Sequence, residues 1–433
     1  MPTYVGDASR IPPLFRQVSF LRLALAVFLF NAGYSIYLFL FNFYLAAQGM
    51  HEARMGSLTA AMVLGGVLGA LPIAHVANRI GSFRVLAISL LFCGVFLGLR
   101  PLSGAFLVQW FLAAVSGFFL VGWSVLIFPL IAAAVRCQER AGAFQILFGL
   151  ATGAGCVGAI VGGHLPGICA RFLPRLSPAG SDRLGLFLAA ALVALSSLSL
   201  PRGKTLEPAT TLTRMRLTRR LIFLFAISAW WAFLLGAVNP FSGIYFLAQF
   251  RMGISTIGSF FFLVQAGVAL ALLVVGAGRL SSLPVWVLFL GAQLLVALSL
   301  WGMATHLLWL AEAAYLTFML AQQFSQPALQ SLLLHSASSS ERNSIEGWNI
   351  LFTTVSQSLS AQIFGLYWGH WGYSAILPFL ALATLLVVAL EAIVHASLAK
   401  QSEELPVAQR QETCRRQDEA LHRSGTEQAS AER

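Results

Sequence analysis

A chain of 433 residues that is 58% hydrophobic and only 10% charged differs from soluble domains, in which roughly a quarter of the residues are charged. Together with a mean hydropathy of +0.79, this composition excludes an ordinary soluble protein. The net charge of +11 does not indicate a nucleic-acid binder, because Arg and Lys lie in short gaps between long apolar runs. We expect the lipid bilayer, and no nucleic acid, as a partner.

The apolar runs predict helices that cross a membrane. A bilayer core needs about 20 apolar residues in a helix, and stretches free of Asp, Glu, Lys and Arg predict single spans at 23–51, 55–78, 85–99, 101–135, 141–170, 184–201, 221–250 and 252–278. The region 280–340 is predicted to hold two spans that turn near 301–306. The run 347–390 holds two more, which turn at 367–373. The total is twelve spans.

The basic residues predict the orientation of these spans. Twelve spans place both termini on one side, and most Arg and Lys of the loops fall on that side, which is cytoplasmic by the positive-inside rule. We therefore expect both termini in the cytoplasm and the chain in a bacterial inner membrane. The third span is short, and Arg84 and Arg100 at its two ends are expected to extend toward the lipid headgroups.

The sequence repeats itself at an offset of 202 residues. The segment 43–46 recurs at 245–248, and Gly56 recurs as Gly258. The pairs Glu139-Arg140 and Glu341-Arg342 follow the same offset. Because this offset contains six spans, it predicts two six-helix halves with the same membrane orientation. Parallel repeats of this kind place a substrate site near the midplane, between the halves.

The repeat divides the chain into five parts. We expect a cytoplasmic N-terminal segment at 1–20, a six-helix half at 21–200, a cytoplasmic linker at 201–220 and a second six-helix half at 221–397. The remaining residues, 398–433, are polar and of mixed charge, which predicts a disordered cytoplasmic tail.

Over about residues 15–397 the chain resembles the major facilitator superfamily. In the loop after the second span, Arg79, Gly81 and Arg84 match the family's signature, and Asn78 stands in place of its acid. The resemblance implies an all-α integral membrane fold with two parallel six-helix repeats, and a secondary transporter that works by alternating access. It also implies that the third, sixth, ninth and twelfth helices lie outermost. The residues expected to act as conformational loop motifs are Arg79, Gly81, Arg84, Glu139, Arg140, Glu341 and Arg342.

Polar residues at helical spacing are the candidates for a substrate cavity. Polar side chains in a membrane are costly, and they tend to face a bundle interior or a watery cavity. An amide needs several partners or water, which favours cavity lining over simple packing. The candidates are Asn31, Ser35, Asn42, Asn239, Tyr315, Gln323, Gln326, Asn349, Thr353 and Gln357.

Small residues on the same helices favour a different role. Ser, Thr and Gly commonly serve close helix packing and hydrogen bonds between helices. We therefore expect Ser356 and Ser360 to pack against a neighbouring helix, and the glycines of 149–163 to form a packing face.

The charge pattern limits the substrate. No Arg or Lys lies in the middle of a span to bind a buried carboxylate or phosphate, which favours a neutral polar or amphiphilic solute such as a sugar or a small aromatic. A drug-efflux antiporter of the same fold is the alternative, although Ala154 stands where such antiporters carry a proline. A non-transporting receptor or scaffold is an alternative of another class. The acids and histidines are scattered, so we expect no enzyme, no cofactor and no metal site, and the chain is expected to act as a monomer.

Glu312 is the candidate for proton coupling. It lies one to two turns inside the tenth span, on that helix's polar face, where partial loss of water disfavours the charged carboxylate. The resemblance supports this role, since some sugar–proton symporters of the family carry an acid on this helix. Protons are therefore expected as a second partner beside the small-molecule substrate.

Overall fold

The computed structural model describes residues 18–134, 140–175, 177–201, 218–276, 285–335 and 342–403. The first half contains α1 (Val18–Ala47), α2 (Glu52–Ile80), α3 (Ser82–Leu99), the short η2 (Arg100–Leu102), α4 (Phe106–Ala134), α5 (Arg140–Phe172) and α6 (Pro178–Ser199). The second half contains α7 (Arg219–Val238), η4 (Asn239–Phe241), α8 (Ser242–Phe250), α9 (Ile254–Gly276), α10 (Val285–Met303), α11 (Leu308–His335), α12 (Arg342–Trp371) and α13 (Tyr373–Glu403).

These helices confirm the predicted all-α fold of about twelve spans, because α7, η4 and α8 together form one span. The predicted turns are also found: α10 ends at Met303, and α12 gives way to α13 at Gly372, which has a φ of 72°. A left-handed residue of this kind is readily tolerated only as glycine. The predicted linker 201–220 and tail 398–433 lie largely outside the described residues.

Within the described residues, ten helical segments are long and apolar enough to cross a membrane by length and composition. The two long helices that fall short of this are α11 and α12. They hold the amide- and hydroxyl-rich stretches of the second half, which lower their hydropathy. Polarity inside a membrane bundle indicates helices that face protein or water rather than lipid.

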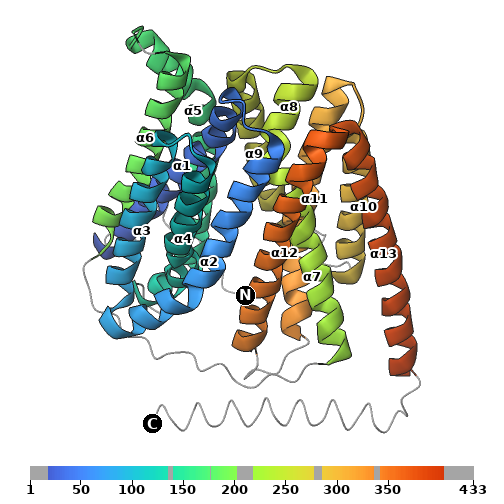
Figure 1. Cartoon of the computed structure of the whole chain (residues 1–433). Coiled ribbons are helices and arrows are strands. Elements are labelled where there is room, and N and C mark those ends of the chain that lie inside the picture. Colours follow the sequence, from blue (N-terminus) through green and yellow to red (C-terminus); the bar gives the residue numbers. More distant parts are fainter. Residues whose placement is uncertain are drawn as a thin grey trace, which may run out of the picture.

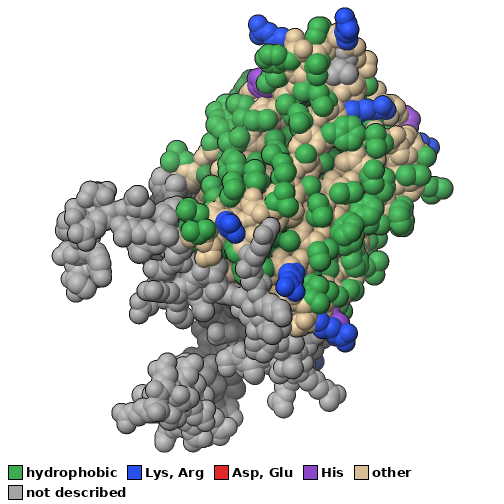
Figure 2. Space-filling model, turned by 90° about the vertical axis from the view of Figure 1, so that its left-hand side faces the viewer, with side chains coloured by type: hydrophobic (Ala, Val, Ile, Leu, Met, Phe, Trp, Pro, Cys, Tyr) green, Lys and Arg blue, Asp and Glu red, His purple; other side chains and the backbone are tan. Residues whose placement is uncertain are grey.

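The two halves lie side by side, and the outer helices are those that the resemblance implies. In the first half, α3 packs on α4 and α6, and in the second half, α10 packs on α11 and α13. Figure 1 shows α3 and α6 toward one edge of the molecule and α10 and α13 toward the other. The face seen in Figure 2 is broadly hydrophobic, with Lys and Arg gathered toward its two ends, as expected of a surface in contact with lipid.

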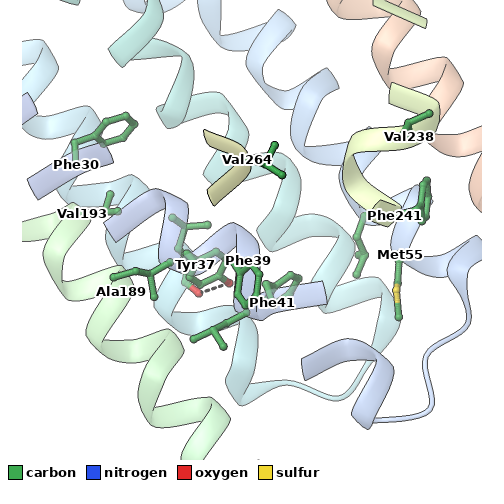
Figure 3. Packing of buried hydrophobic residues seen from close by; sticks show 14 of the residues in the cluster. Phe30, Tyr37, Phe39, Phe41, Met55, Ala189, Val193, Val238, Phe241 and Val264 are labelled. Carbon is green, nitrogen blue, oxygen red and sulfur yellow. Dashed lines mark hydrogen bonds between the residues drawn. The ribbon is translucent and has the colours of Figure 1, made fainter. Parts of the chain in front are cut away.

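A buried apolar layer joins α1 to α6. At Gly33 the backbones approach so closely that an added Cβ atom would lie 2.7 Å from the Ala189 carbonyl oxygen. Tyr37 lies beside this contact (Figure 3), and its hydroxyl donates to the Leu97 carbonyl at 2.8 Å. About two turns further along α1, the Tyr44 hydroxyl donates to the Pro101 carbonyl at 2.9 Å. These bonds fix α1 against the end of α3 and the turn η2.

The expectation for Arg100 is wrong. Its side chain is only 3% exposed, and its guanidinium carbon lies 4.0 Å from the centre of the Phe41 ring. Nη1 donates to the Met62 sulfur at 3.8 Å. These contacts with α1 and α2 show that the side chain points into the helix bundle. There an aromatic face compensates part of the lost hydration.

Two helix pairs form the most extensive contacts between the halves: α2 with α12, and α5 with α9. Both cross at glycines. A Cβ atom added to Gly56 would lie 2.9 Å from the Gly365 Cα atom, and one added to Gly258 would lie 2.7 Å from the Gly163 Cα atom. Gly258 follows Gly56 by 202 residues, and Gly365 follows Gly163 by the same number. We call these two contacts the glycine crossings.

The glycine crossings lie at one end of the molecule. Gly56 and Gly258 are near the beginnings of α2 and α9, whereas Gly163 and Gly365 are near the ends of α5 and α12. All four ends lie on the face opposite to that at which α1 begins and α13 ends. We call the face at which α1 begins and α13 ends the terminal face. The face that holds the glycine crossings is the opposite face.

Candidate functional site

A cavity of about 300 Å³ lies between the two halves. This volume is at the lower end of the range of small-molecule pockets. Helices α1 and α5 of the first half contribute to its wall, together with η4, α8, α9 and α11 of the second. The lining residues are Asn31, Tyr34, Ser35, Leu38, Phe39, Asn42, Phe43, Gly155, Ala159, Asn239, Pro240, Ser242, Gly243, Phe261, Val264, Gln265, Tyr315 and Met319.

Four amide side chains from three spans face this cavity: Asn31, Asn42, Asn239 and Gln265. Asn31 donates within its own helix to the Val27 carbonyl at 2.7 Å, which leaves its side-chain oxygen as an acceptor. An amide has two donor hydrogens and an acceptor oxygen. Together these groups offer a polar solute both donors and acceptors.

Asn42 connects the halves at the edge of the cavity. Its Nδ2 atom donates to the Pro240 carbonyl at 2.7 Å. This carbonyl belongs to η4, the short 3-10 turn that separates α7 from α8. Pro240 lacks an N–H group and breaks the helical ladder. At this break the Pro240 carbonyl accepts a hydrogen bond from the other half of the molecule.

Aromatic rings form the apolar part of the wall. The Tyr315 ring stacks on Phe261 with centroids 5.2 Å apart and an angle of 17° between the planes. Phe261 in turn meets Phe39 of the other half edge to face at 6.0 Å. The Tyr315 hydroxyl lies 3.4 Å from the Ser242 Oγ atom. Such rings provide flat apolar surfaces for a planar or amphiphilic solute.

Among the described residues that line this cavity there is no Asp, Glu, Lys, Arg or His. The described residues also hold no group of three or more His, Cys, Asp or Glu suited to a metal ion. What the cavity offers chemically is hydrogen bonding and aromatic contact. It offers no side chain that would neutralise a full charge on a bound solute.

The structure brings five of the ten sequence candidates to this cavity: Asn31, Ser35, Asn42, Asn239 and Tyr315. Ser35 also donates from its Oγ atom to the Gly155 carbonyl of α5 at 3.0 Å. These residues come from both halves, as a site shared between the halves requires.

Four other candidates do not line the cavity. Gln323 is exposed, Asn349 is buried, and Gln357 is half-buried. Thr353 donates to the Asn349 carbonyl in its own helix at 2.8 Å. The side chain of the tenth candidate, Gln326, lies outside the described residues. A helical stripe predicts which residues share a face, but it does not predict how far along the helix a cavity extends.

Gln265 was missed in the sequence. It is the only Asn or Gln in α9, a helix otherwise rich in Phe, Val, Leu and Gly. A lone amide in an apolar span is costly unless it meets a partner or water. The isolation of this amide in an apolar helix was the sequence signal that could have identified Gln265 as a cavity-lining residue.

Glu312 is half-buried near the beginning of α11 and is not among the cavity-lining residues. Of the loop motifs, Gly81 has a φ of 98° and joins α2 to α3, while Arg79 and Arg84 beside it are exposed. The left-handed turn accounts for a glycine at this point. The remaining motif residues, or their side chains, lie outside the described part of the chain: Glu139, Arg140, Glu341 and Arg342.

The hydroxyls of α12 serve packing, as expected. Ser356 donates to the Ala229 carbonyl of α7 at 2.6 Å, and Ser360 donates to the Phe233 carbonyl of the same helix. The expectation for the glycines of 149–163 is correct only in part. Gly158 and Gly163 contact other helices closely, whereas a Cβ atom at Gly149 would meet nothing within 4 Å.

No protein-family model and no curated protein matches this sequence. Solved structures do match in fold. A bacterial homologue of the human lysosomal transporter Spinster, inward-facing and unoccupied, superposes with a TM-score of 0.69 at 16% identity over 88% of this chain and 96% of its own. Its inward-facing, occupied form superposes with a TM-score of 0.70 at 15% identity, over 89% of this chain and 97% of its own. A mutant of the nucleoside transporter NupG superposes with a TM-score of 0.71 at 15% identity, over 85% of this chain and 98% of its own.

At such low identity the likeness establishes the fold alone. The match extends over nearly the whole length of each solved transporter, so both six-helix halves are included. The predicted major facilitator fold is therefore confirmed.

Proposed function

We propose that this chain is a secondary transporter that moves a small, neutral polar or amphiphilic solute across a membrane by alternating access. The observation that supports this most strongly is the cavity itself. It lies between two repeated halves and receives amides and aromatic rings from both, and the described residues of its wall include no Asp, Glu, Lys, Arg or His. A receptor or scaffold of this fold has no need for such groups on both halves.

The glycine crossings support a state closed on the opposite face. Backbones that meet at Gly56–Gly365 and Gly163–Gly258 leave no room for side chains between the halves, and therefore none for a solute. With the terminal face in the cytoplasm, this is the inward-facing state. Alternating access then requires both crossings to separate while the cavity remains in place.

The composition of the cavity narrows the solute class. A sugar would use the amides, whereas a nucleoside or a small aromatic would also use the ring surfaces of Phe261 and Tyr315. A solute with a full charge would enter without a counter-charge, which is costly in a desolvated site. We therefore expect neutral sugars and nucleosides to be better substrates than dicarboxylates or organic cations.

Uptake into proteoliposomes containing the purified chain tests this proposal. Radiolabelled sugars, nucleosides, small aromatics, dicarboxylates and quaternary ammonium ions are compared with protein-free vesicles. Saturable uptake of a neutral solute supports the proposal. Saturable binding without entry into the lumen would favour the receptor alternative, and export of cations in exchange for protons would favour the drug-efflux alternative.

Orientation is tested with single cysteines in a background that lacks the five native ones. Ser255, at the opposite face, and Arg84, at the terminal face, are both exposed. With the terminal face in the cytoplasm, Ser255→Cys reacts with a membrane-impermeant thiol reagent in intact cells, and Arg84→Cys reacts only after lysis. The reverse pattern would invert the topology.

Coupling to protons through Glu312 is part of the same proposal. It rests on a half-buried carboxyl on α11, the helix that also carries Tyr315 into the cavity. Glu312→Gln preserves the shape of the side chain but removes the exchangeable proton. Accumulation driven by a pH gradient should disappear while downhill exchange continues. Continued accumulation against a gradient in this variant would remove Glu312 from the mechanism.

A further inference from the structure

A buried polar pair lies between α10 and α13, in the outer part of the second half. Gln293 is 0% exposed and Glu391 is 1% exposed. The Nε2 atom of Gln293 donates to the Oε2 atom of Glu391 at 2.8 Å. Neither residue lines the cavity between the halves, so the transport proposal assigns this pair no role.

The pair leaves two oxygen atoms without hydrogen-bond partners. These are the Oε1 atom of Gln293 and the Oε1 atom of Glu391, both buried. An ionised carboxylate only accepts hydrogen bonds, so it would leave both oxygens unsatisfied. It would also leave a full charge in an apolar environment, which is strongly unfavourable.

A single proton resolves both problems. A protonated carboxyl donates one hydrogen bond and still accepts another. With the proton on Oε1, Glu391 donates to the Gln293 side-chain oxygen while it accepts from the Gln293 Nε2 atom. The result is a cyclic acid–amide pair in which all four polar groups are satisfied and no net charge is buried.

We propose that Glu391 is a proton-binding site, and that its bound proton joins α13 to α10 through this cyclic pair with Gln293. The proton is held at an interface between two outer helices, away from the solute path. The site is therefore distinct from any proton that moves with a substrate. It requires only the fold, and it does not depend on the proposed transport function.

The surroundings supply no counter-charge among the described side chains. Helix α10 has no Asp, Glu, Lys, Arg, His, Tyr or Cys between Val285 and Met303. On the other packed helices, Glu312, Tyr315, Tyr367, His370 and Tyr373 lie toward the opposite face, whereas Glu391 is toward the terminal face. The titratable residues nearer to that end have side chains outside the described residues: His335, Arg342, Glu346, His395, Lys400 and Glu403.

Because the proton stabilises the contact, its loss weakens the fold. Raising the pH removes the proton and leaves a buried carboxylate with two orphan acceptors, so stability decreases as the solution becomes alkaline. Glu391→Gln replaces the acid with an amide that also donates and accepts but does not titrate. The variant should therefore lose this alkaline sensitivity.

Infrared difference spectroscopy of the reconstituted chain at neutral pH tests the proposal. Wild type should show the C=O stretch of a protonated carboxylic acid, and Glu391→Gln should lack this band. The matched variant Glu312→Gln should keep the band that belongs to Glu391. His395→Ala should keep the Glu391 band, because the pair needs no histidine. If Glu391→Gln leaves the protonated-acid region unchanged, Glu391 is ionised and the proposal is wrong.

Gln293→Leu provides a second readout that keeps the carboxyl in place. Loss of the amide partner should shift the Glu391 band to higher frequency, and thermal melting should begin at a lower temperature. In wild type the melting temperature should fall as the pH rises, and in Glu391→Gln it should fall less. An unshifted band in Gln293→Leu, or equal alkaline sensitivity of wild type and Glu391→Gln, would refute the pairing.

Discussion

At the glycine crossings, each glycine of the first half has a glycine counterpart 202 residues further along the chain, whereas the amides of the cavity have no amide counterpart. Gly56 and Gly365 meet as Gly258 and Gly163 do. Asn42, by contrast, corresponds to Ile244, and Gln265 corresponds to Val63. One region of the interface is therefore symmetric and the other is not.

This difference separates two physical requirements. Halves that rock against each other need equivalent hinging contacts on both sides of the pseudo-two-fold axis, and close packing demands small residues at both places. A solute has no such symmetry, so the polar groups around it are placed individually. The crossings are thus expected to control the movement, and the cavity to control the substrate.

The largest effect is expected at the crossings. A leucine at Gly56 or Gly258 would force its side chain into the backbone of the facing helix, so the opposite face should not close. Transport should fall more than about tenfold, since such overpacking costs on the order of 1–3 kcal/mol. A reporter cysteine at Gln265 should become reactive from the opposite face in either variant.

Gly149→Leu is the matched control, because nothing lies within 4 Å of its Cβ position. It should transport normally and leave the reporter cysteine protected. If Gly56→Leu and Gly258→Leu differ strongly from one another, the two crossings are not equivalent and the symmetric account of the movement is wrong.

Asn42→Ala should have the next largest effect, because Asn42 both lines the cavity and bonds across the interface between the halves. It loses the 2.7 Å bond to the Pro240 carbonyl as well as an amide in the cavity. We expect about a tenfold loss of uptake at low solute concentration, from about 1–1.5 kcal/mol. Uptake assays with and without saturating solute measure this loss.

Asn31→Ala provides the comparison, since Asn31 bonds only within α1 among the described residues. It should raise the KM without altering the accessibility of the reporter cysteine. Equal accessibility changes in Asn31→Ala and Asn42→Ala would show that the bond between Asn42 and Pro240 has no part in the movement.

Gln265→Ala should affect substrate binding alone. The loss of one hydrogen bond to a neutral solute is worth about 1 kcal/mol, or about a fivefold increase in KM, with little change in melting temperature. Gln249→Ala is the control, because Gln249 pairs with His306 at 2.8 Å on an exposed part of α8. An unchanged KM in Gln265→Ala, with every transported solute, would exclude this amide from the site.

The smallest effect is expected for Ser358→Ala. The Ser358 Oγ atom donates to the Ala60 carbonyl across the α2–α12 crossing at 3.1 Å. Hydrogen bonds between membrane helices contribute about 0.6 kcal/mol on average, so the closed state should lose about threefold in population. Labelling rates of the reporter cysteine measure this shift, and unchanged rates would mean that the glycine contact alone maintains the crossing.

The sequence by itself determined the number of spans, the two halves and the offset that relates them. Bilayer thickness and the cost of burying charge impose a pattern that is readable along the chain. The repeat even marked Gly56 and Gly258 as equivalent before their contacts were known. Polar stripes also identified Asn31, Asn42 and Tyr315 as members of one inward-facing set.

Only the tertiary structure decided which of these residues meet. The helical period assigns a face to each residue, but depth and partner depend on how twelve helices pack. For that reason Gln323 lies away from the cavity while Gln265 lines it, and Arg100 is turned inward onto Phe41. The partnership of Gln293 with Glu391 was equally unreadable, because 98 residues separate them in the chain and only close helix packing brings them together.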